Sequence, residues 1–297
     1  MFNKDTNPIK IAFFGNSEFS FIVLEEMKKL GIIPELIVTT IDKPQGRKMI
    51  LTKTPTKVWA ENNSIEYIEA TKLKDPKFLE KISNYDLFIV ASYGKIIPKE
   101  VIDLPKYKVL NVHPSLLPKY RGPSPLQTQI LNDEKEVGVT IMLIDEQVDH
   151  GAIISQKVVD ISNWPISFEE LQILLAREGS KLLAEILPKW IKEEITEKEQ
   201  DHDKVTFTKK VKKADGLINL SDDSYKNYLK YLAYQDWPNI YFEIDKKASA
   251  NDNVSDQKKI RVIIKKADFK DGLLNILKVV PEGKKEMDYK SFLNGLK

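Results

Sequence analysis

The chain has 297 residues, 42% of them hydrophobic, and a formal net charge of +2, which suits a globular protein of one large or two smaller domains. No apolar run approaches the roughly 18 residues of a membrane-spanning helix, so we expect no span. The lack of cysteine excludes disulfides, thiolate catalysis and cysteine-ligated metals. Because the first ten residues are polar and lack the apolar core of a signal peptide, we expect a cytoplasmic location.

Charge is distributed unevenly along the chain. Residues 1–203 carry 26 basic and 31 acidic side chains, whereas residues 204–297 carry 20 basic and 13 acidic ones. A basic C-terminal third indicates a polyanionic partner such as nucleic acid. A lysine-rich surface that is merely solvated explains the same numbers equally well, so composition alone leaves both interpretations open.

The first part of the chain alternates between β and α patterns. Ile9–Phe14 is a continuous apolar run that ends at Gly15, which is typical of a parallel strand buried on both faces. Further strands are predicted at Glu35–Thr40, Ile65–Ile68, Leu87–Ala91 and Val109–His113. Helices are predicted at Phe19–Leu30, Lys57–Asn62 and Pro76–Ile82, with a polar loop over Asp42–Thr56. This alternation predicts an α/β fold with a doubly wound, mostly parallel sheet.

The rest of the chain divides at a charged run. Before the run come strands at Gly138–Ile144 and Ile153–Val159 and a long helix at Phe168–Ile191. Lys192–Asp203 is almost wholly charged, and we interpret it as a linker. After it, short strands are predicted at Val205–Thr208, Asn239–Ile244, Lys259–Ile264 and Leu273–Val279, with a helix near Asp223–Ala233.

These patterns predict three parts: an N-terminal domain at residues 1–191, a charged linker at 192–204 and a basic C-terminal domain at 205–297. The short strands and turns of the last part suit a small β-barrel similar to an OB fold. The polar stretch Lys246–Lys258 is predicted to be a flexible loop tip.

Motifs for common cofactors are missing. Gly15 follows a strand and precedes a helix, but Gly15–Phe19 lacks the second and third glycines of a dinucleotide fingerprint, and no P-loop sequence occurs. The three histidines, His113, His150 and His202, have no metal-ligand spacing. His202 lies in the charged run, where a solvated side chain is expected. We therefore predict neither a nucleotide cofactor nor a metal site.

The most informative stretch ends the predicted strand Val109–His113 and continues as Asn111-Val112-His113-Pro114. Asn111 and His113 are two residues apart and therefore face the same side of the strand. An amide donor beside an imidazole can stabilise an oxyanion and move a proton, as acyl transfer requires. Alone, each residue is better explained by bonds to backbone or a turn. Together, at a strand end where doubly wound folds bind ligands, they indicate a functional site.

Two other segments are candidate parts of this site. Asp149 lies in a polar loop between two apolar strands, where an aspartate most often caps a turn. If that loop faced the strand end, the carboxylate would orient His113 and help to deprotonate an attacking amine. Ser115–Pro118 contains two leucines that are costly to expose, so they either line an apolar slot for a flat ligand or anchor the loop in the core.

The Asn-x-His pair, the Ser-Leu-Leu-Pro loop and the downstream Asp149 resemble the pattern of the 10-formyltetrahydrofolate-dependent formyltransferases. That pattern is equally compatible with glycinamide ribonucleotide formyltransferases, sugar formyltransferases and formyltetrahydrofolate hydrolases. Six further segments are similar to the methionyl-tRNA formyltransferases in particular, so that the resemblance covers nearly the whole chain. They are Asp42–Lys48, Val90–Pro98, Gly138–Met142, Trp237–Pro238, Gly272–Ile276 and Gly283–Met287.

Two positions depart from the family pattern. Gly15–Phe19 replaces the usual GTPxF sequence, which puts an anion-holding role for that turn in question. Pro114 replaces a common glycine after the histidine, although related formyltransferases also carry proline there.

The resemblance implies transfer of a formyl group from the cosubstrate 10-formyltetrahydrofolate to the α-amino group of methionyl initiator tRNA, by a monomer without a metal. It implies that Asn111, His113 and Asp149 are catalytic. Folate-binding residues are expected at Ser115, Leu116, Leu117 and Pro118. Contacts with tRNA are expected at Arg47, Lys43 and Lys48 and in the basic C-terminal domain.

Three alternatives remain open on the sequence alone. A formyltetrahydrofolate hydrolase would use water in place of the amine, but it needs no long basic domain. A transferase for another amine, such as that of a nucleotide sugar, would share the same catalytic pattern. An RNA-binding module on an inactive transferase fold would not need Asn111, His113 and Asp149 together.

Overall fold

The computed structural model describes residues 9–45, 49–245 and 259–296, and the chain forms two compact units. Unit 1 comprises Met1–Pro125, Glu136–Ile161 and Gln172–Thr208. Unit 2 comprises Leu126–Lys135, Ser162–Leu171 and Lys209–Lys297. Within the described residues, no helix is both long and apolar enough to cross a membrane.

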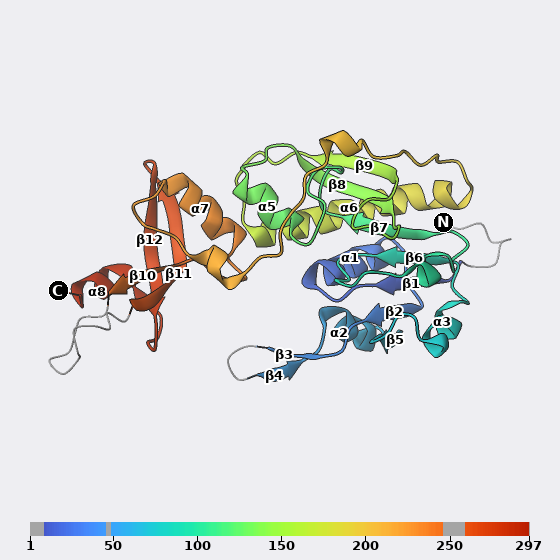
Figure 1. Ribbon diagram of the computed structural model, residues 1–297, viewed down its shortest axis with the longest axis horizontal. Coiled ribbons are helices and arrows are strands. Elements are labelled where there is room, and N and C mark those ends of the chain that lie inside the picture. Colours follow the sequence, from blue (N-terminus) through green and yellow to red (C-terminus); the bar gives the residue numbers. More distant parts are fainter. Residues whose placement is uncertain (1–8, 46–48, 246–258, 297) are drawn as a thin grey trace. The chain divides into compact units, whose positions relative to one another are not determined.

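Unit 1 is built on a seven-stranded sheet in the order β5-β2-β1-β6-β7-β8-β9 (Figure 1). The strands are β1 (Ile11–Phe14), β2 (Leu36–Thr39), β5 (Glu66–Glu69), β6 (Leu87–Val90), β7 (Val109–His113), β8 (Val137–Leu143) and β9 (Ile153–Val159). Neighbours from β5 to β7 pair in parallel, whereas β7 with β8 and β8 with β9 pair antiparallel. Because β1 lies between β2 and β6, the chain winds outward in both directions. The predicted doubly wound, mostly parallel sheet is confirmed.

Helices and one small hairpin accompany these strands along residues 9–191. The helices are α1 (Glu18–Lys29), α2 (Pro55–Asn62), α3 (Pro76–Ile82), α4 (Lys99–Ile102), α5 (Pro125–Leu131) and α6 (Phe168–Ile191). Leu126–Leu131 of α5 and Phe168–Leu171 of α6 belong to unit 2. The predicted bounds of α3, α6, β7 and β9 agree with the structure residue for residue. The polar loop over Asp42–Thr56 is more ordered than we predicted, because it contains the antiparallel strands β3 (Lys43–Gln45) and β4 (Ile50–Thr52).

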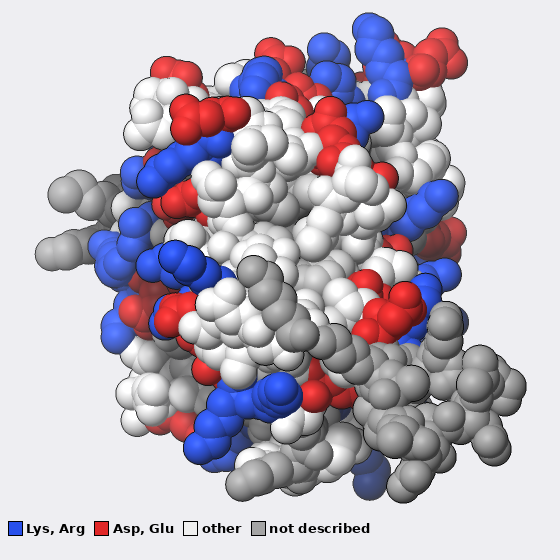
Figure 2. Space-filling view, turned by 90° about the vertical axis from the view of Figure 1, so that its left-hand side faces the viewer, with Lys and Arg blue, Asp and Glu red and all other residues white. Residues whose placement is uncertain are grey.

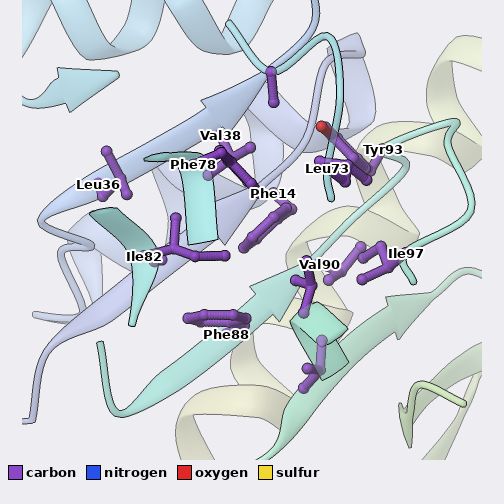
Figure 3. Close-up of a cluster of buried hydrophobic side chains, with 14 residues drawn as sticks. Phe14, Leu36, Val38, Leu73, Phe78, Ile82, Phe88, Val90, Tyr93 and Ile97 are labelled. Carbon is purple, nitrogen blue, oxygen red and sulfur yellow. The ribbon is translucent and has the colours of Figure 1, made fainter. Parts of the chain in front are cut away.

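One side of the sheet packs on a cluster of buried apolar side chains (Figure 3). Phe14 and Phe88 come from the neighbouring strands β1 and β6, and their ring centroids are 5.2 Å apart. Tyr93 packs edge-on against Phe14 with its ring centroid at 5.6 Å. Apolar side chains buried on both faces explain why β1, β2 and β6 read as continuous apolar runs in the sequence.

The Asn16-Ser17 departure has a structural role at the turn after β1. Ser17 is the N-cap of α1, and its hydroxyl accepts a hydrogen bond from the Ser20 amide. The Asn16 side chain donates to the Tyr93 carbonyl at 2.6 Å. The two residues therefore start the helix and tie the turn after β1 to the turn after β6, as N-cap and loop amides commonly do.

The charged run that we interpret as a linker is anchored along unit 1. The backbone of Lys198 exchanges two hydrogen bonds of 2.8 Å with Ile153 at the start of β9. Gln200 is buried, with only 4% of its surface exposed. The expected strand at Val205–Thr208 is reduced to a single bridge between Phe207 and Arg121. Pairing with distant segments, which sequence periodicity does not reveal, orders this run.

Unit 2 contains an antiparallel sheet in the order β10-β11-β12-β13 (Figure 1). Its strands are β10 (Tyr241–Asp245), β11 (Lys259–Lys270), β12 (Leu273–Pro281) and β13 (Met287–Asp288), with helices α7 (Ser224–Ala233) and α8 (Tyr289–Asn294). Asp271 and Gly272 join β11 to β12 with φ angles of 51° and 75°, as an Asp-Gly hairpin turn requires. A mostly β C-terminal part is confirmed; β13 and α8 were not predicted. The predicted loop tip Lys246–Lys258 lies outside the described residues.

Candidate active site

Asn111 and His113 lie on β7, the strand at which the sheet changes from parallel to antiparallel pairing. Asn111 pairs with Val90 of β6 on one side and Met142 of β8 on the other. All five residues of β7 are buried, and Asn111 and His113 are 8% and 4% exposed. The alternation of a strand places both side chains on one face near its carboxyl end.

Asp149 reaches His113 from the loop between β8 and β9. Its Oδ1 is 3.6 Å from Nδ1 of His113, which is an ion-pair distance but too long for a hydrogen bond. Asp149 has a φ of 49°, in the left-handed region that few non-glycine residues adopt, although aspartate does so more often than most. The structure thus brings Asp149 to the end of β7, whereas the sequence alone favoured a role as a turn cap.

The segment Tyr120–Gly122 contacts both of these side chains through its backbone. The Tyr120 carbonyl is 3.3 Å from Nε2 of His113. The Gly122 amide donates to Oδ2 of Asp149 at 2.7 Å. Gly122 has a φ of 112°, and a Cβ there would come within 2.8 Å of the Thr208 hydroxyl, so only glycine fits. This segment fixes the imidazole and the carboxylate relative to each other.

Arg121 and Gln200 are buried neighbours of the site that sequence reasoning missed. Arg121 is 3% exposed and donates from Nε and Nη2 to Oε1 of Gln200, at 3.0 and 2.6 Å. Burial lowers the pKa of Arg121, and the charges of Asp149 and Asp145 oppose that change. Nothing local marks Gln200 in its charged surroundings, so no sequence signal identifies it.

The remaining two histidines form a stacked pair. The rings of His150 and His202 are parallel to within 10°, with centroids 4.5 Å apart. His150 Nδ1 is 2.6 Å from a carboxylate oxygen of Asp145, and Nη2 of Arg121 is 3.0 Å from Nδ1 of His202. His202 is exposed, as expected, but it is not merely solvated. Among the described residues, no group of three His, Cys, Asp or Glu side chains is arranged to hold a metal.

The predicted folate loop, Ser115–Pro118, is held by hydrogen bonds to residues outside it. The Ser115 side chain is fully buried, and its hydroxyl donates to the Lys119 carbonyl at 2.8 Å. Leu117 is buried; its amide donates to the Thr140 hydroxyl, and its carbonyl accepts from Gln156 at 2.8 Å. One leucine therefore anchors the loop in the core. Leu116 is partly buried, with a methyl group over Gly138 of β8.

The basic side chains predicted to meet tRNA differ in their surroundings. Lys43 begins the β3–β4 hairpin and is exposed, whereas Arg47 and Lys48 lie outside the described residues. Lys57, in the same basic segment, is buried and bonds both Asp42 and Glu69 at 2.9 Å. These two hydrogen bonds raise the pKa of Lys57. Lys57 therefore braces the base of the hairpin.

Both parts of the chain match models of the same protein family. Residues 9–187 match the family described as formyl transferase. Residues 210–297 match the formyl transferase C-terminal domain. Together the two matches cover almost all of the sequence, including β7, the β8–β9 loop and the sheet of unit 2.

Relatives that are similar over nearly the full length of the chain identify a subgroup of this family. The methionyl-tRNA formyltransferase of Campylobacter lari is 39% identical, with 96% of each chain covered. That of Thermodesulfovibrio yellowstonii is 36% identical, covering 97% of this chain and 96% of its own.

Solved structures share the fold at lower identity. A methionyl-tRNA formyltransferase from Clostridium thermocellum superposes with a TM-score of 0.58 at 15% identity, covering 95% of this chain and all of its own. An N-formyltransferase from Helicobacter canadensis, solved with folinic acid and dTDP-3-aminofucose, gives 0.62 at 20% identity, with coverage of 89% and 88%. At full-length identities of 36–39% to curated relatives of one kind, the chain belongs to the methionyl-tRNA formyltransferases, within the formyl transferase family.

Proposed function

We propose that the protein transfers the formyl group of 10-formyltetrahydrofolate to the α-amino group of methionyl initiator tRNA, with Asn111, His113 and Asp149 as its catalytic residues. The observation that carries the assignment of residues is the 3.6 Å approach of Asp149 to His113 at the end of β7. Full-length similarity to methionyl-tRNA formyltransferases supports the choice of acceptor.

Proton removal is assigned to Asp149. A free α-amino group has a pKa of about 7.7–8.0, so much of it is protonated near pH 7 and must lose a proton before it can attack. The Asp149 carboxylate takes that proton, directly or through a water molecule. Its second oxygen accepts a hydrogen bond from the Gly122 amide, which keeps the carboxylate directed at the site.

Charge stabilisation is assigned to Asn111 and His113. Attack on the formyl carbon forms the new C–N bond and places negative charge on the formyl oxygen. The Asn111 amide and a protonated His113 donate hydrogen bonds to that oxygen, and one such donor is worth about 3–4 kcal/mol in other enzymes. The first ammonium proton passes through Asp149 to solvent, and after attack Asp149 takes the remaining extra proton of the newly bonded nitrogen. When the bond to the folate nitrogen breaks, His113 supplies its proton to that nitrogen, and Asp149 then returns its proton to His113.

The donor site is assigned to Ser115, Leu116, Leu117 and Pro118. Formyl transferases use a formyltetrahydrofolate donor, and a structural neighbour was solved with folinic acid. The hydrogen bonds of Ser115 to Lys119 and of Leu117 to Thr140 give this loop a fixed backbone, and the partly exposed Leu116 offers apolar surface to a flat ring.

Binding of the acceptor, methionyl-tRNA, is assigned to the β3–β4 hairpin and to the basic C-terminal residues. Lys43, Arg47 and Lys48 contact the acceptor end, while phosphates position the tRNA on residues 205–297. On the face drawn in Figure 2, basic and acidic side chains are interspersed around uncharged surface. The described residues of that face form no continuous basic stripe, so we assign phosphate contacts to separate lysines. We place the reaction in the cytoplasm, with tRNA and folate as the partners.

One experiment separates the alternatives. The protein is incubated with 10-formyltetrahydrofolate and, in separate reactions, methionyl initiator tRNA, an amino nucleotide sugar, or buffer alone. We expect rapid formylation of the methionyl-tRNA. Formylation of the amino sugar and release of formate in buffer should both be slow. Preferential formylation of the sugar, or an equal rate of formate release in buffer, would replace the proposed function with a sugar formyltransferase or a hydrolase.

A further inference from the structure

The buried side-chain amide of Gln200 joins the backbone of the β8–β9 loop to Arg121. Gln200 comes from the charged run after α6, and its Nε2 donates to the carbonyls of Asp149 and Gly151, at 2.9 and 2.7 Å. Its Oε1 accepts two hydrogen bonds from Arg121. Both ends of the amide are therefore used, and each end binds a different loop of the site.

These two loops are the ones that hold the reacting groups. Arg121 lies between Tyr120, whose carbonyl faces His113, and Gly122, whose amide binds the Asp149 carboxylate. The carbonyls bound by Gln200 flank His150 in the loop that carries Asp149. A shift of Gln200 would thus change the position of Asp149 relative to His113.

The backbone on both sides of Gln200 is itself fixed. Lys198 pairs with Ile153 through two hydrogen bonds. Further along, the Arg121 amide donates to the Thr206 carbonyl at 2.9 Å, and the Thr208 amide donates to the Arg121 carbonyl at 2.7 Å. Gln200 therefore has little freedom to follow the loop; instead the loop must adopt the position that Gln200 defines.

A restraint on Asp149 would select one of its accessible backbone conformations. Its φ of 49° lies in the left-handed region, which aspartate adopts more often than most residues with a side chain, while ordinary negative φ angles also remain accessible to it. We propose that Gln200 is a positioning residue for formyl transfer: it holds the Asp149 backbone so that the carboxylate stays within reach of His113. This inference rests on the proposed catalytic role of Asp149.

The proposal has a selective test in Gln200→Glu. The carboxylate can still accept from Arg121, but it has no N–H to donate to the carbonyls of Asp149 and Gly151. We expect kcat to fall by about 10- to 100-fold, since displacement of a reacting group by about 1 Å has effects of that size. The KM values for both substrates should change less than about twofold, because uniform binding is not affected. The neighbouring exposed Glu199→Gln is the matched control and should behave as wild type.

A double-mutant cycle with Asp149→Asn distinguishes positioning from general destabilisation. If Gln200 acts through Asp149, Gln200→Glu should cost less than about twofold in kcat once Asp149 is already replaced. Equal losses in both backgrounds, or a single Gln200→Glu variant with wild-type kcat, would overturn the inference. Nearly wild-type turnover of Asp149→Asn alone would instead overturn the proposed role of Asp149.

Loss of folding is controlled separately. Thermal unfolding is measured for every variant, and Gln200→Asn provides a milder change that keeps the amide but shortens its reach. If Gln200→Glu is unfolded at the assay temperature, Gln200→Asn is tested in its place. A lower kcat with unchanged KM, together with non-additivity with Asp149→Asn, supports the proposal. A wild-type kcat contradicts it.

Discussion

The carboxylate of Asp149 lies 3.6 Å from the imidazole of His113, although the two residues come from different strands and loops of the chain. The Gly122 amide holds the other carboxylate oxygen at 2.7 Å, and the Tyr120 carbonyl faces the opposite nitrogen of the ring at 3.3 Å. A carboxylate and an imidazole are thereby kept adjacent at the end of β7, the strand that also carries Asn111.

Replacement of Asn111 or His113 by alanine should lower kcat by about 100-fold or more, because each change removes a donor that we assign to the oxyanion. Initial rates of methionyl-tRNA formylation measure the effect, and unchanged thermal unfolding shows that the fold is retained. The exposed Asn62→Ala is a control for asparagine loss in the same unit. Near-normal turnover of either site variant would rule out its assigned role.

Replacement of Lys57 by methionine should destabilise the base of the hairpin. The ammonium bonds two carboxylates, and Asp42 and Glu69 would lose that partner, at a cost of about 2 kcal/mol in the free energy of unfolding. Chemical denaturation measures this difference. Lys53→Met removes an exposed pair with Glu61 and should leave stability unchanged; equal effects of the two changes would contradict the buried brace.

The stabilisation that Lys57 gains from Asp42 and Glu69 depends on pH in a defined way. Because the pKa of Lys57 is raised in the folded protein, its stabilisation is fully present below the unfolded pKa of about 10.4 and is lost only as pH rises through the folded value. The difference in unfolding free energy between wild type and Lys57→Met should therefore stay constant from about pH 7 to 9. A difference that already shrinks across this window would contradict the ion pair.

Arg47→Ala should raise the KM for methionyl-tRNA while folate binding stays unchanged, since we assign Arg47 to the acceptor end of the tRNA. Steady-state kinetics and direct binding of a folate analogue separate the two effects. Replacement of the exposed Lys72, which lies outside the hairpin, is the control. Loss of folate binding in Arg47→Ala would show that the hairpin belongs to the donor site instead.

Binding of tRNA should weaken steeply with salt, because we assign phosphate contacts to lysines of the C-terminal part and such contacts release counterions. Replacement of the exposed Lys284 and Lys285 by glutamine should reduce the slope of log K against log salt by about 1 for each phosphate that a lysine no longer neutralises. Lys72→Gln should leave the slope as it is. Salt-independent binding of the wild-type protein would exclude the proposed phosphate contacts.

Local patterns account for what could be predicted of the fold. Continuous apolar runs marked β1 and β6, and helical spacing marked α1 and α6, because burial on one face or on both leaves a direct trace in the sequence. The placement of Asn111 and His113 on one face of β7 follows from strand geometry alone. The hairpin β3–β4 was missed because its exposed strands carry no apolar alternation toward a core.

Local patterns were thus enough to predict a doubly wound sheet and the strand that carries Asn111 and His113, and resemblance was enough to indicate the family. The contacts that distant groups make with this strand are seen only in the folded protein. Asp149 reaches His113 through a loop with a positive φ, Gln200 is drawn into the site by Arg121, and Lys57 turns inward to Asp42. Such contacts depend on long-range hydrogen bonds between loops, and neither residue spacing nor local propensity encodes them.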